Sequence, residues 1–466
     1  MLFSSITFLY YFLPVVLFLY YLLPGSLKNV WLLFASLFFY GWGEPVFVLW
    51  MLLAIMFAYL AGIFIEKYQN TKKGKLIFFF AVTGAIGYLG VFKYADFFVD
   101  NMNRFTGMNL PLPGIGLPIG ISFYTFQLIS YLIDIYRGNA KAKKNLISFA
   151  LYISMCPQLI AGPIVRYTDI EKQLDEREIY FTHMGEGMGR FVIGLSKKVL
   201  LANPLGEFCE IVKASSDLSV LYLWFYGICC ALHIYFDFSG YSDMAIGLGK
   251  MLGFRFMENF HYPYIAESIS DFWRRWHISL GTWFRDYVYI PLGGNRVPLG
   301  RFWLNIMIVW FLTGFWHGAG WNFILWGLYF GILLVIEKFW LGRYLSGKKG
   351  WNHLYVWLFV IISFVIFDGT DPARMIIFLK GMFGVLGLPM ISTEMLYYIR
   401  HYGIIILFSC FAALPVGKNL YIKLKESVKN KKMIETGEVI GLLFLFILVT
   451  AYLVDGSYNP FLYFRF

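Results

Sequence analysis

The sequence predicts an all-α, polytopic membrane protein with about 11–13 transmembrane helices, together with re-entrant and interfacial amphipathic helices. Hydrophobic residues make up 59% of its 466 residues and charged residues only 14%, whereas a soluble globular domain carries about 25% charged residues. A membrane-spanning helix needs roughly 20 apolar residues, and such stretches recur from the first residue to the last. These observations exclude a soluble enzyme.

Thirteen apolar stretches are candidate membrane spans. The first, residues 2–23, has no basic segment before it and no small-residue cleavage site after it, so we expect a retained helix rather than a signal peptide. The stretch 145–162 is doubtful as a full span, and a further stretch, 373–390, is interrupted by Lys380 and three glycines. We expect the latter to be re-entrant or interfacial. The candidates are 2–23, 29–43, 46–66, 76–98, 118–136, 145–162, 219–238, 241–256, 303–316, 322–340, 352–369, 397–417 and 437–454.

The net charge of +11 is concentrated in a few short loops. Short loops rich in Lys and Arg stay cytoplasmic, which places the N-terminus and the loop 100–116 outside. Nucleic-acid binding is excluded because the basic clusters are separated by membrane spans, whereas contact with anionic lipid or an anionic cytosolic substrate stays open. The clusters are 67–75, 137–144, 343–349 and 418–432.

The chain shows no internal repeat and no long polar linker, so we expect one domain over residues 1–466. Within it we distinguish the N-terminal helices (1–138), a middle part with a cytoplasmic interfacial region (139–301), and the C-terminal helices (302–466). The five cysteines show no CxxC spacing, so neither a disulfide framework nor a metal site is expected.

A charged, aromatic segment from Asp271 to Asn295 interrupts the apolar sequence. On a helical wheel its large apolar side chains fall within about 100° of one another, with charged side chains opposite. The pattern predicts one amphipathic helix over 271–287, lying in the membrane interface with its apolar face inward. His277 lies about 40° from Trp273 on the same wheel, where it either faces the protein interior or is incidental to a surface anchor. The stripe consists of Trp273, Trp276, Leu280, Trp283, Phe284 and Tyr287.

A second histidine, His317, lies inside the apolar run FLTGFWHGAGWNFILWG. Ionisable residues at membrane depth are costly and usually functional. Gly318 and Gly320 remove side chains from the following turn, leaving room for a substrate or a neighbouring backbone. A neutral imidazole can take a proton from a hydroxyl group; the alternative is a structural histidine that bonds to a neighbouring helix. Two small-xxx-small pairs, which let helices approach closely, are formed by Gly314, Gly318, Gly327 and Gly331.

Two other motifs place polar groups in apolar surroundings. His233, Asp237 and Asp243 surround a Ser-Gly pair that we expect to separate two spans, 219–238 and 241–256. Carboxylates at membrane depth imply either a cavity or a structural ion pair. Gln127 and Asp134 lie in a predicted span. We interpret Asp237, Asp243, Gln127 and Asp134 as helix–helix hydrogen-bonding or tunnel-lining groups rather than catalytic ones.

The runs SDFWRRWHISLGTWFRDYVYIPLGGNR and LTGFWHGAGWNFILWG resemble the membrane-bound O-acyltransferase superfamily, and within it the bacterial branch that acetylates exported polysaccharides. YFDFSGYSDMAIGLGKMLGF, LPIGISFYTFQLISYLIDIYRG and the C-terminal YNPFLYFRF also fit that branch, so the resemblance covers essentially the whole chain. It implies helices around a central tunnel, with His317 at the position of the catalytic histidine. His277 matches the second position, which is often asparagine in eukaryotic relatives. The D-alanyl-teichoic-acid branch shares both histidine positions and stays as the alternative.

The resemblance also implies a reaction and its partners. It implies acetyl-CoA as the acyl donor, no permanently bound cofactor, and no metal. Delivery would go from a multi-pass protein of the bacterial inner membrane to a periplasmic or extracellular acyltransferase partner, which modifies an exported polysaccharide. Cytoplasmic cations would bind the donor's phosphates. The candidates are Arg274, Arg275, Arg285, Arg296 and Lys250.

Two readings from other functional classes stay open. Many spans with broken helices and polar residues at mid-membrane are also typical of transporters, although the two halves show no repeat and a carrier would not explain the RRWH segment. A scaffold that only anchors an external transferase would have structural histidines. Replacing His317 separates these readings from the enzyme.

Overall fold

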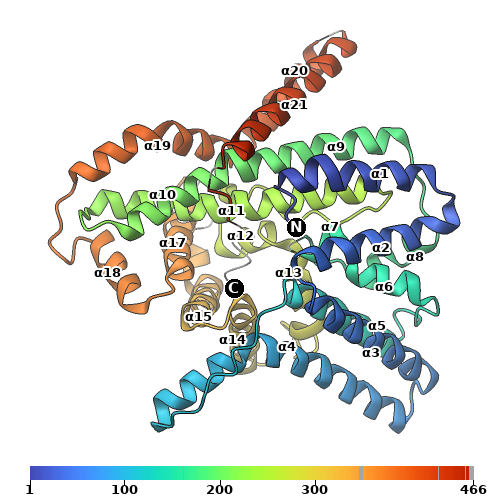
Figure 1. Cartoon of the computed structure of the whole chain (residues 1–466). Coiled ribbons are helices and arrows are strands. Elements are labelled where there is room, and N and C mark those ends of the chain that lie inside the picture. Colours follow the sequence, from blue (N-terminus) through green and yellow to red (C-terminus); the bar gives the residue numbers. More distant parts are fainter. Residues whose placement is uncertain (161, 346–349, 429, 457, 461–466) are drawn as a thin grey trace. The chain divides into compact units, whose positions relative to one another are not determined.

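A computed structural model describes residues 1–160, 162–345, 350–428, 430–456 and 458–460. Within these residues all regular secondary structure is helical (Figure 1), which confirms the predicted all-α class. Eight helices in this described part of the chain are long and apolar enough to cross a membrane, and Thr7–Leu22 is a shorter apolar helix. Each of the eight overlaps a span predicted from the sequence. The chain is therefore a multi-pass membrane protein.

The helices form two compact units, each made of two chain segments. Unit 1 comprises Met1–Phe191 and Met244–Met257, and unit 2 comprises Val192–Asp243 and Glu258–Phe466. The helices α9 (Phe181–Ser196) and α11 (Val220–Met251) contribute residues to both units. The prediction of a single domain is not tested by this division.

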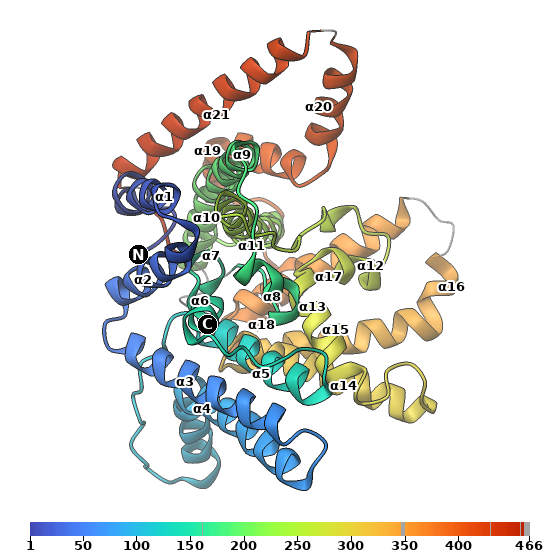
Figure 2. The ribbon, with the colours of Figure 1, turned by 90° about the vertical axis from the view of Figure 1, so that its right-hand side faces the viewer.

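Unit 1 contains three helices, α3, α4 and α5, that run side by side (Figures 1 and 2). A small residue permits one of these contacts, because a Cβ at Gly62 would lie 2.6 Å from the Tyr131 ring. The stretch 145–162, doubtful as a span, forms the short helices α6 and α7. The helices are α1 (Leu13–Leu22), α2 (Gly25–Gly43), α3 (Phe47–Lys67), α4 (Lys72–Thr106), α5 (Ile121–Arg137), α6 (Leu146–Ser154), α7 (Cys156–Leu159) and α8 (Tyr167–Asp175), with a π-helical turn over Thr7–Phe12.

Unit 2 carries both histidines singled out above. The predicted re-entrant stretch 373–390 overlaps the 11-residue helix α18, which is shorter than the roughly 17 residues that a span requires. The helices are α10 (Asn203–Ala214), α12 (Ile269–Arg275), α13 (Ile278–Phe284), α14 (Leu299–His317), α15 (Trp321–Ile336), α16 (Gly342–Leu345), α17 (Trp351–Asp368), α18 (Pro372–Met382), α19 (Thr393–Ala412), α20 (Val416–Ser427) and α21 (Lys431–Val454), with π-helical turns over Lys197–Ala202, Arg285–Tyr289 and Glu337–Leu341 and a 3-10 turn over Pro263–Ile265.

The glycines of α14 and α15 let these two helices approach closely, as their spacing predicts. A Cβ at Gly314 would lie 2.3 Å from the Phe323 carbonyl oxygen, and one at Gly327 would lie 2.2 Å from the Trp310 carbonyl oxygen. Gly318 has a different neighbour, because its Cβ would lie 2.2 Å from the Phe323 ring. The Phe323 side chain therefore fills the space left by Gly318 in the turn after His317.

The expected break between spans at Ser239 and Gly240 is wrong, because α11 is continuous through both residues. A Cβ at Gly240 would lie 2.7 Å from the Gly194 carbonyl oxygen, so this glycine serves close helix packing rather than a turn.

The carboxylates of α11 in unit 2 are paired with consecutive lysines. Lys198 forms a buried ion pair with Asp237, and Lys197 Nζ lies 2.6 Å from an Asp243 carboxylate oxygen. These pairs fit the structural interpretation of both carboxylates.

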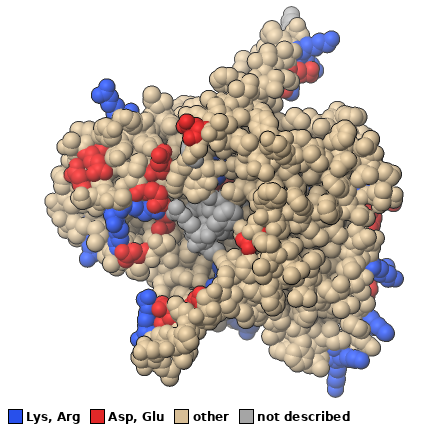
Figure 3. Space-filling view, viewed as in Figure 1, with Lys and Arg blue, Asp and Glu red and all other residues tan. Residues whose placement is uncertain are grey.

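Apolar side chains dominate the surface. The face in Figure 3 is mostly uncharged, with Lys, Arg, Asp and Glu confined to separate clusters. Large apolar side chains are exposed along the candidate spans, including Phe444 and Ile447 of α21. Such exposure would be unfavourable in water but suits a helix surrounded by lipid hydrocarbon.

Candidate active site

The helix is interrupted at Trp276 and His277, so the prediction of one amphipathic helix over 271–287 is wrong. Trp276 is extended, and His277 adopts the left-handed conformation with φ 45° before α13 begins. Backbone bonds to a distant segment replace the helical ones: the Ile278 amide donates to the Asn259 carbonyl over 2.9 Å, and the His261 amide to the Arg275 carbonyl over 2.9 Å. The apolar stripe is still buried, except for Trp273, which is half-buried.

Glu337 holds the start of α12 in place. Its buried carboxylate accepts hydrogen bonds from the Ile269 amide at 2.6 Å, the Ser270 amide at 3.0 Å and the Ser270 hydroxyl at 2.7 Å. The first amides of a helix lack intrahelical partners and favour negative charge. Glu337 therefore fixes the helix that carries Arg274.

His277 is buried and held by polar contacts on one side. Its Nδ1 lies 3.2 Å from Asn259 Oδ1 and 3.4 Å from Ser279 Oγ. Its Nε2 is buried and has no hydrogen-bond partner among the described residues. Burial lowers the pKa of His277 well below its usual range, and the nearby His317 lowers this pKa further. The imidazole is therefore neutral at physiological pH.

Aromatic rings connect the two histidines. The Trp316 ring lies 6.0 Å from the His277 ring and 5.0 Å from the His317 ring. His317 ends α14, and its ring is also edge-on to Trp326 at 5.0 Å and to Phe367 at 5.4 Å. Residues that the sequence separates by 40 positions are thus brought together around Trp316.

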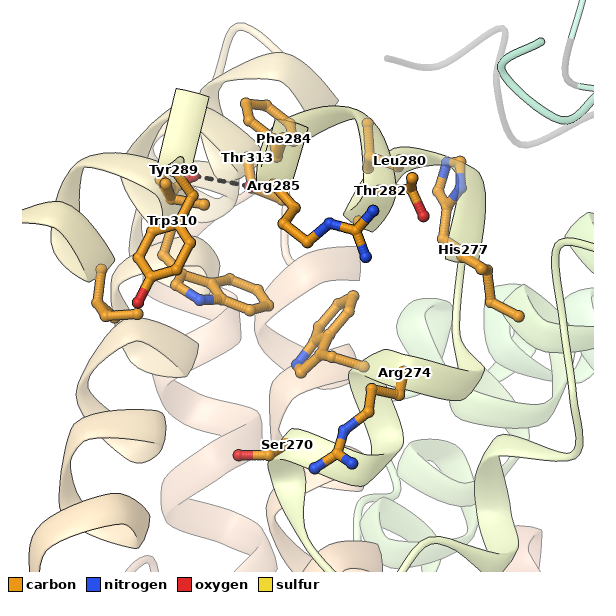
Figure 4. Close-up of a pocket in the computed structure, with 15 residues that line it drawn as sticks. Ser270, Arg274, His277, Leu280, Thr282, Phe284, Arg285, Tyr289, Trp310 and Thr313 are labelled. Atoms are coloured by element: carbon orange, nitrogen blue, oxygen red, sulfur yellow. Dashed lines mark hydrogen bonds between the residues drawn. The ribbon is translucent and has the colours of Figure 1, made fainter. Parts of the chain in front are cut away.

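A cavity of about 400 Å³ lies beside His277 in unit 2. Arg274 on α12 and Arg285 in the turn after α13 both line it; the Arg285 guanidinium points toward its middle, and the Arg274 guanidinium lies at its edge beside Ser270 (Figure 4). Arg274 forms no ion pair within the described part of the chain, whereas Arg285 forms one with Asp286 at 2.7 Å. The cavity is therefore lined by two cations, with the neutral His277 at its border, a suitable environment for an anionic ligand. Its remaining lining residues are Ser270, Trp273, Ile278, Leu280, Gly281, Thr282, Phe284, Tyr289, Ile306, Val309, Trp310 and Thr313.

The other predicted donor-binding cations lie elsewhere. Arg275 Nε is 2.9 Å from an Asp271 carboxylate oxygen, and Arg275 does not line the cavity. Arg296 is exposed and is also absent from the lining. Lys250 lies in unit 1, where it pairs with Glu186.

The polar residues of α5, Gln127 and Asp134, are buried in unit 1 and do not line this cavity. Of the five predicted donor-binding cations, Arg274 and Arg285 line the cavity.

Sequence reasoning missed Asn259, Ser279 and Glu337. Asn259 and Ser279 looked like ordinary loop and helix residues, because the contact that joins them spans 20 positions. Glu337 directly follows an apolar run, where a carboxylate usually marks a helix end in water. The sequence has no basic residue one helical turn before or after Glu337. This was the available signal that its carboxylate binds a group from another part of the chain.

Comparison with known proteins gives the family of this chain. The profile of the MBOAT, membrane-bound O-acyltransferase family matches residues 34–378, which include both histidines. The chain belongs to the membrane-bound O-acyltransferase family. It is therefore an O-acyltransferase.

Three groups of transferases are represented among the relatives of this chain. It is 44% identical over 381 residues to the probable alginate O-acetylase AlgI of Pseudomonas aeruginosa, covering 80% of this chain and 72% of the relative. A peptidoglycan O-acetyltransferase of Helicobacter pylori is 33% identical over 424 residues, covering 83% and 80%. A teichoic acid D-alanyltransferase of Bacillus subtilis is 28% identical over 282 residues, covering 54% and 68%.

We expect His277→Ala to lower turnover about 10- to 100-fold, as is common when a residue that orients reacting groups is removed. His277→Asn keeps a hydrogen-bonding group and should retain more activity. Acyl-transfer rates of the purified variants, compared at equal amounts of folded protein, check this order. Wild-type activity in both variants would remove His277 from the site.

Proposed function

We propose that this O-acyltransferase takes an acetyl group from the thioester of acetyl-CoA at the cytoplasmic face and passes it on for O-acetylation of an exported cell-surface polysaccharide. The main support is the pair of buried histidines around Trp316, beside a cavity with two arginines. The names of the alginate and peptidoglycan relatives support the acetyl group and the polysaccharide. The D-alanyltransferase is less similar and covers less of the chain, which favours acetyl over D-alanyl.

In the proposed reaction His317 is the general base. Its neutral imidazole takes the proton of the attacking hydroxyl, and the hydroxyl oxygen bonds to the thioester carbonyl carbon. The carbon–sulfur bond breaks, and the leaving thiolate of CoA takes the proton from the imidazolium. The rings of Trp316, Trp326 and Phe367 around His317 limit the access of water, which protects the thioester from hydrolysis.

The proposal gives each face of the membrane a role. The donor's phosphates stay with the cytoplasmic arginines while its thin acyl-bearing arm reaches toward His317. A periplasmic or extracellular acyltransferase partner receives the acetyl group and modifies the polysaccharide. The protein resides in the bacterial inner membrane with its N-terminus outside, needs no permanently bound cofactor and binds no nucleic acid.

This orientation predicts which loops an impermeant thiol reagent reaches. In a Cys410→Ala background, which removes the exposed cysteine, Thr106→Cys should be labelled in intact cells. Ser427→Cys should be labelled only after the membrane is opened, because it lies in the basic cluster 418–432. Ser346, another candidate for an inside probe, lies outside the described residues. Labelling of Ser427→Cys in intact cells would contradict the orientation.

The cavity arginines are expected to act on donor binding. Arg274→Gln and Arg285→Gln should each raise the KM for acetyl-CoA about five- to tenfold and lower kcat less, because phosphate contacts are similar in the ground and transition states. Arg296→Gln is the matched control, since Arg296 is exposed and does not line the cavity. Steady-state kinetics distinguish these outcomes. An equal rise of KM in the control would show a general charge effect instead.

Mass analysis of the cell-surface polysaccharides, with and without this protein, tests the proposed function. We expect O-acetyl esters on one polysaccharide to disappear when the protein is absent and to return with the wild-type chain. Loss of D-alanyl esters instead would support teichoic acid as the acceptor. Unchanged ester content of every surface polymer would contradict the proposal.

A further inference from the structure

The hydrogen bonds of Asn259 determine which nitrogen of His277 carries the proton. The Ser279 backbone amide, 3.2 Å from Asn259 Oδ1, can only donate, so the Asn259 atom that faces it must be the carbonyl oxygen. The Ser279 hydroxyl donates to the same oxygen at 2.9 Å. Because this oxygen also lies 3.2 Å from His277 Nδ1, Nδ1 must be the donor. The lone pair of the neutral ring is then on Nε2.

The Nε2 atom of His277 needs a partner that the protein does not provide. It is buried and unpaired within the described residues, and buried polar atoms in folded proteins nearly always have a hydrogen-bond partner. Of the aromatic rings next to His277, Phe238 at 4.5 Å has no hydrogen-bond donor, and the indole N–H of Trp316, whose ring lies 6.0 Å away, does not bond to Nε2. A bound molecule with an N–H or O–H group would satisfy this nitrogen.

We propose that Asn259 is a positioning residue that holds His277 as the Nδ1–H tautomer, so that Nε2 accepts a hydrogen bond from an amide N–H or a hydroxyl group of the substrate. This inference rests on the proposed function. It gives the two histidines different roles: His317 takes a proton during the reaction, and His277 orients the substrate. It also accounts for the left-handed backbone at His277, since with φ 45° the ring lies against Asn259.

The groups around His277 determine the pH at which its imidazole becomes protonated. Burial and the second imidazole, His317, both oppose protonation of His277. The wild-type enzyme should therefore lose the Nε2 acceptor only at acidic pH, below the usual histidine range. The charged and titratable groups on the elements packed against His277 are Arg274, Arg275 and Asp271 on α12, Arg285 and Asp286 after α13, His317 on α14, Glu258 and His261 beside Asn259, and the Asp237–Lys198 and Asp243–Lys197 pairs of α11.

Asn259→Asp separates a tautomer-setting role from a structural one. The carboxylate keeps Nδ1 protonated but stabilises the imidazolium, raising the pKa of His277 by about 1–3 units. The acidic limb of the kcat–pH profile should move up by the same amount, and above it the activity should exceed that of Asn259→Leu. Asn259→Leu removes the acceptor and should lower kcat about 10- to 100-fold at every pH. Equal loss in both variants at all pH values would overturn the inference.

Asn352→Asp is the matched control, because Asn352 is a buried amide on α17 with no contact to His277. It reports the effect of a buried carboxylate alone and should leave the position of the acidic limb unchanged. A shift of the limb in this control equal to that in Asn259→Asp would also overturn the inference.

A spectroscopic readout does not depend on activity. In protein labelled with ¹⁵N-histidine, His277 can be assigned among the seven histidines as the signal lost in His277→Asn. We expect a protonated Nδ1 and an unprotonated Nε2 at neutral pH, and a mixture of tautomers in Asn259→Leu. A protonated Nε2 in the wild type would refute the inference even if acyl transfer occurs. The expected tautomer without acyl transfer would instead refute the proposed function.

Discussion

His317→Ala is expected to reduce acyl transfer about 10²–10⁴-fold, the usual cost of removing a general base. The membrane fold should survive, because the edge-to-face contacts of the His317 ring with Trp316, Trp326 and Phe367 are each worth only about 0.5–1.5 kcal/mol. Release of free CoA thiol from acetyl-CoA by the purified protein measures the rate. Size-exclusion profiles in detergent establish that the variant is folded.

His401→Ala is the matched control. His401 is an exposed histidine of α19 whose hydrogen bond among the described residues is to the Tyr397 carbonyl of its own helix, so its loss should leave transfer within about twofold of wild type. If His317→Ala folds and transfers acetyl groups at the wild-type rate, the catalytic assignment is wrong and the scaffold reading gains support.

Gly327→Ala is expected to destabilise unit 2 by about 1–3 kcal/mol or more, because added methyl groups in a packed contact force the backbone to move. The new Cβ would lie 2.2 Å from the Trp310 carbonyl oxygen and 3.0 Å from Gly314 Cα. Both are backbone atoms that cannot rotate away, so α14 and α15 must separate. His317 ends α14, and activity should therefore fall further than the loss of folded protein explains. Thermal unfolding in detergent and the rate per folded molecule check both parts.

Gly441→Ala provides the comparison for this prediction. Gly441 lies inside the apolar helix α21, and a Cβ there would have no neighbour within 4 Å. Alanine favours helix over glycine by about 1 kcal/mol, so this variant should be as stable as wild type or slightly more so. Equal destabilisation by both changes would show that close packing of α14 on α15 is not the cause.

Much of the fold follows from local patterns in the sequence. Runs of apolar residues locate every helix that is long enough to span the membrane, because only helices satisfy the backbone in hydrocarbon. The glycine spacing in GFWHGAGWNFILWG predicts the α14–α15 contact, since side-chain size at every fourth position decides how near two helices come. The cost of placing an imidazole among apolar residues indicates His317 and His277 as candidate site residues.

The remaining features depend on contacts between distant residues. The helical periodicity over 271–287 continues through His277, but the helix is interrupted there because the Ile278 amide donates its hydrogen bond to the Asn259 carbonyl instead of to its own helix. Ser239 and Gly240 look like a turn, whereas Gly240 is needed for the approach of α9. Arg274 and Arg275 are adjacent and indistinguishable in the sequence, yet Arg274 lines the cavity and Arg275 pairs with Asp271. Tertiary contacts decide each of these cases.

Transfer from one defined face of the membrane tests the central claim most directly. The protein is placed in vesicles, its orientation is established with the Thr106→Cys and Ser427→Cys labels, and radiolabelled acetyl-CoA is supplied to one face at a time. We predict release of CoA thiol only when the donor is on the face with Arg274 and Arg285, and loss of that release in His317→Ala. Equal release from both faces, or undiminished release in His317→Ala, would contradict the account.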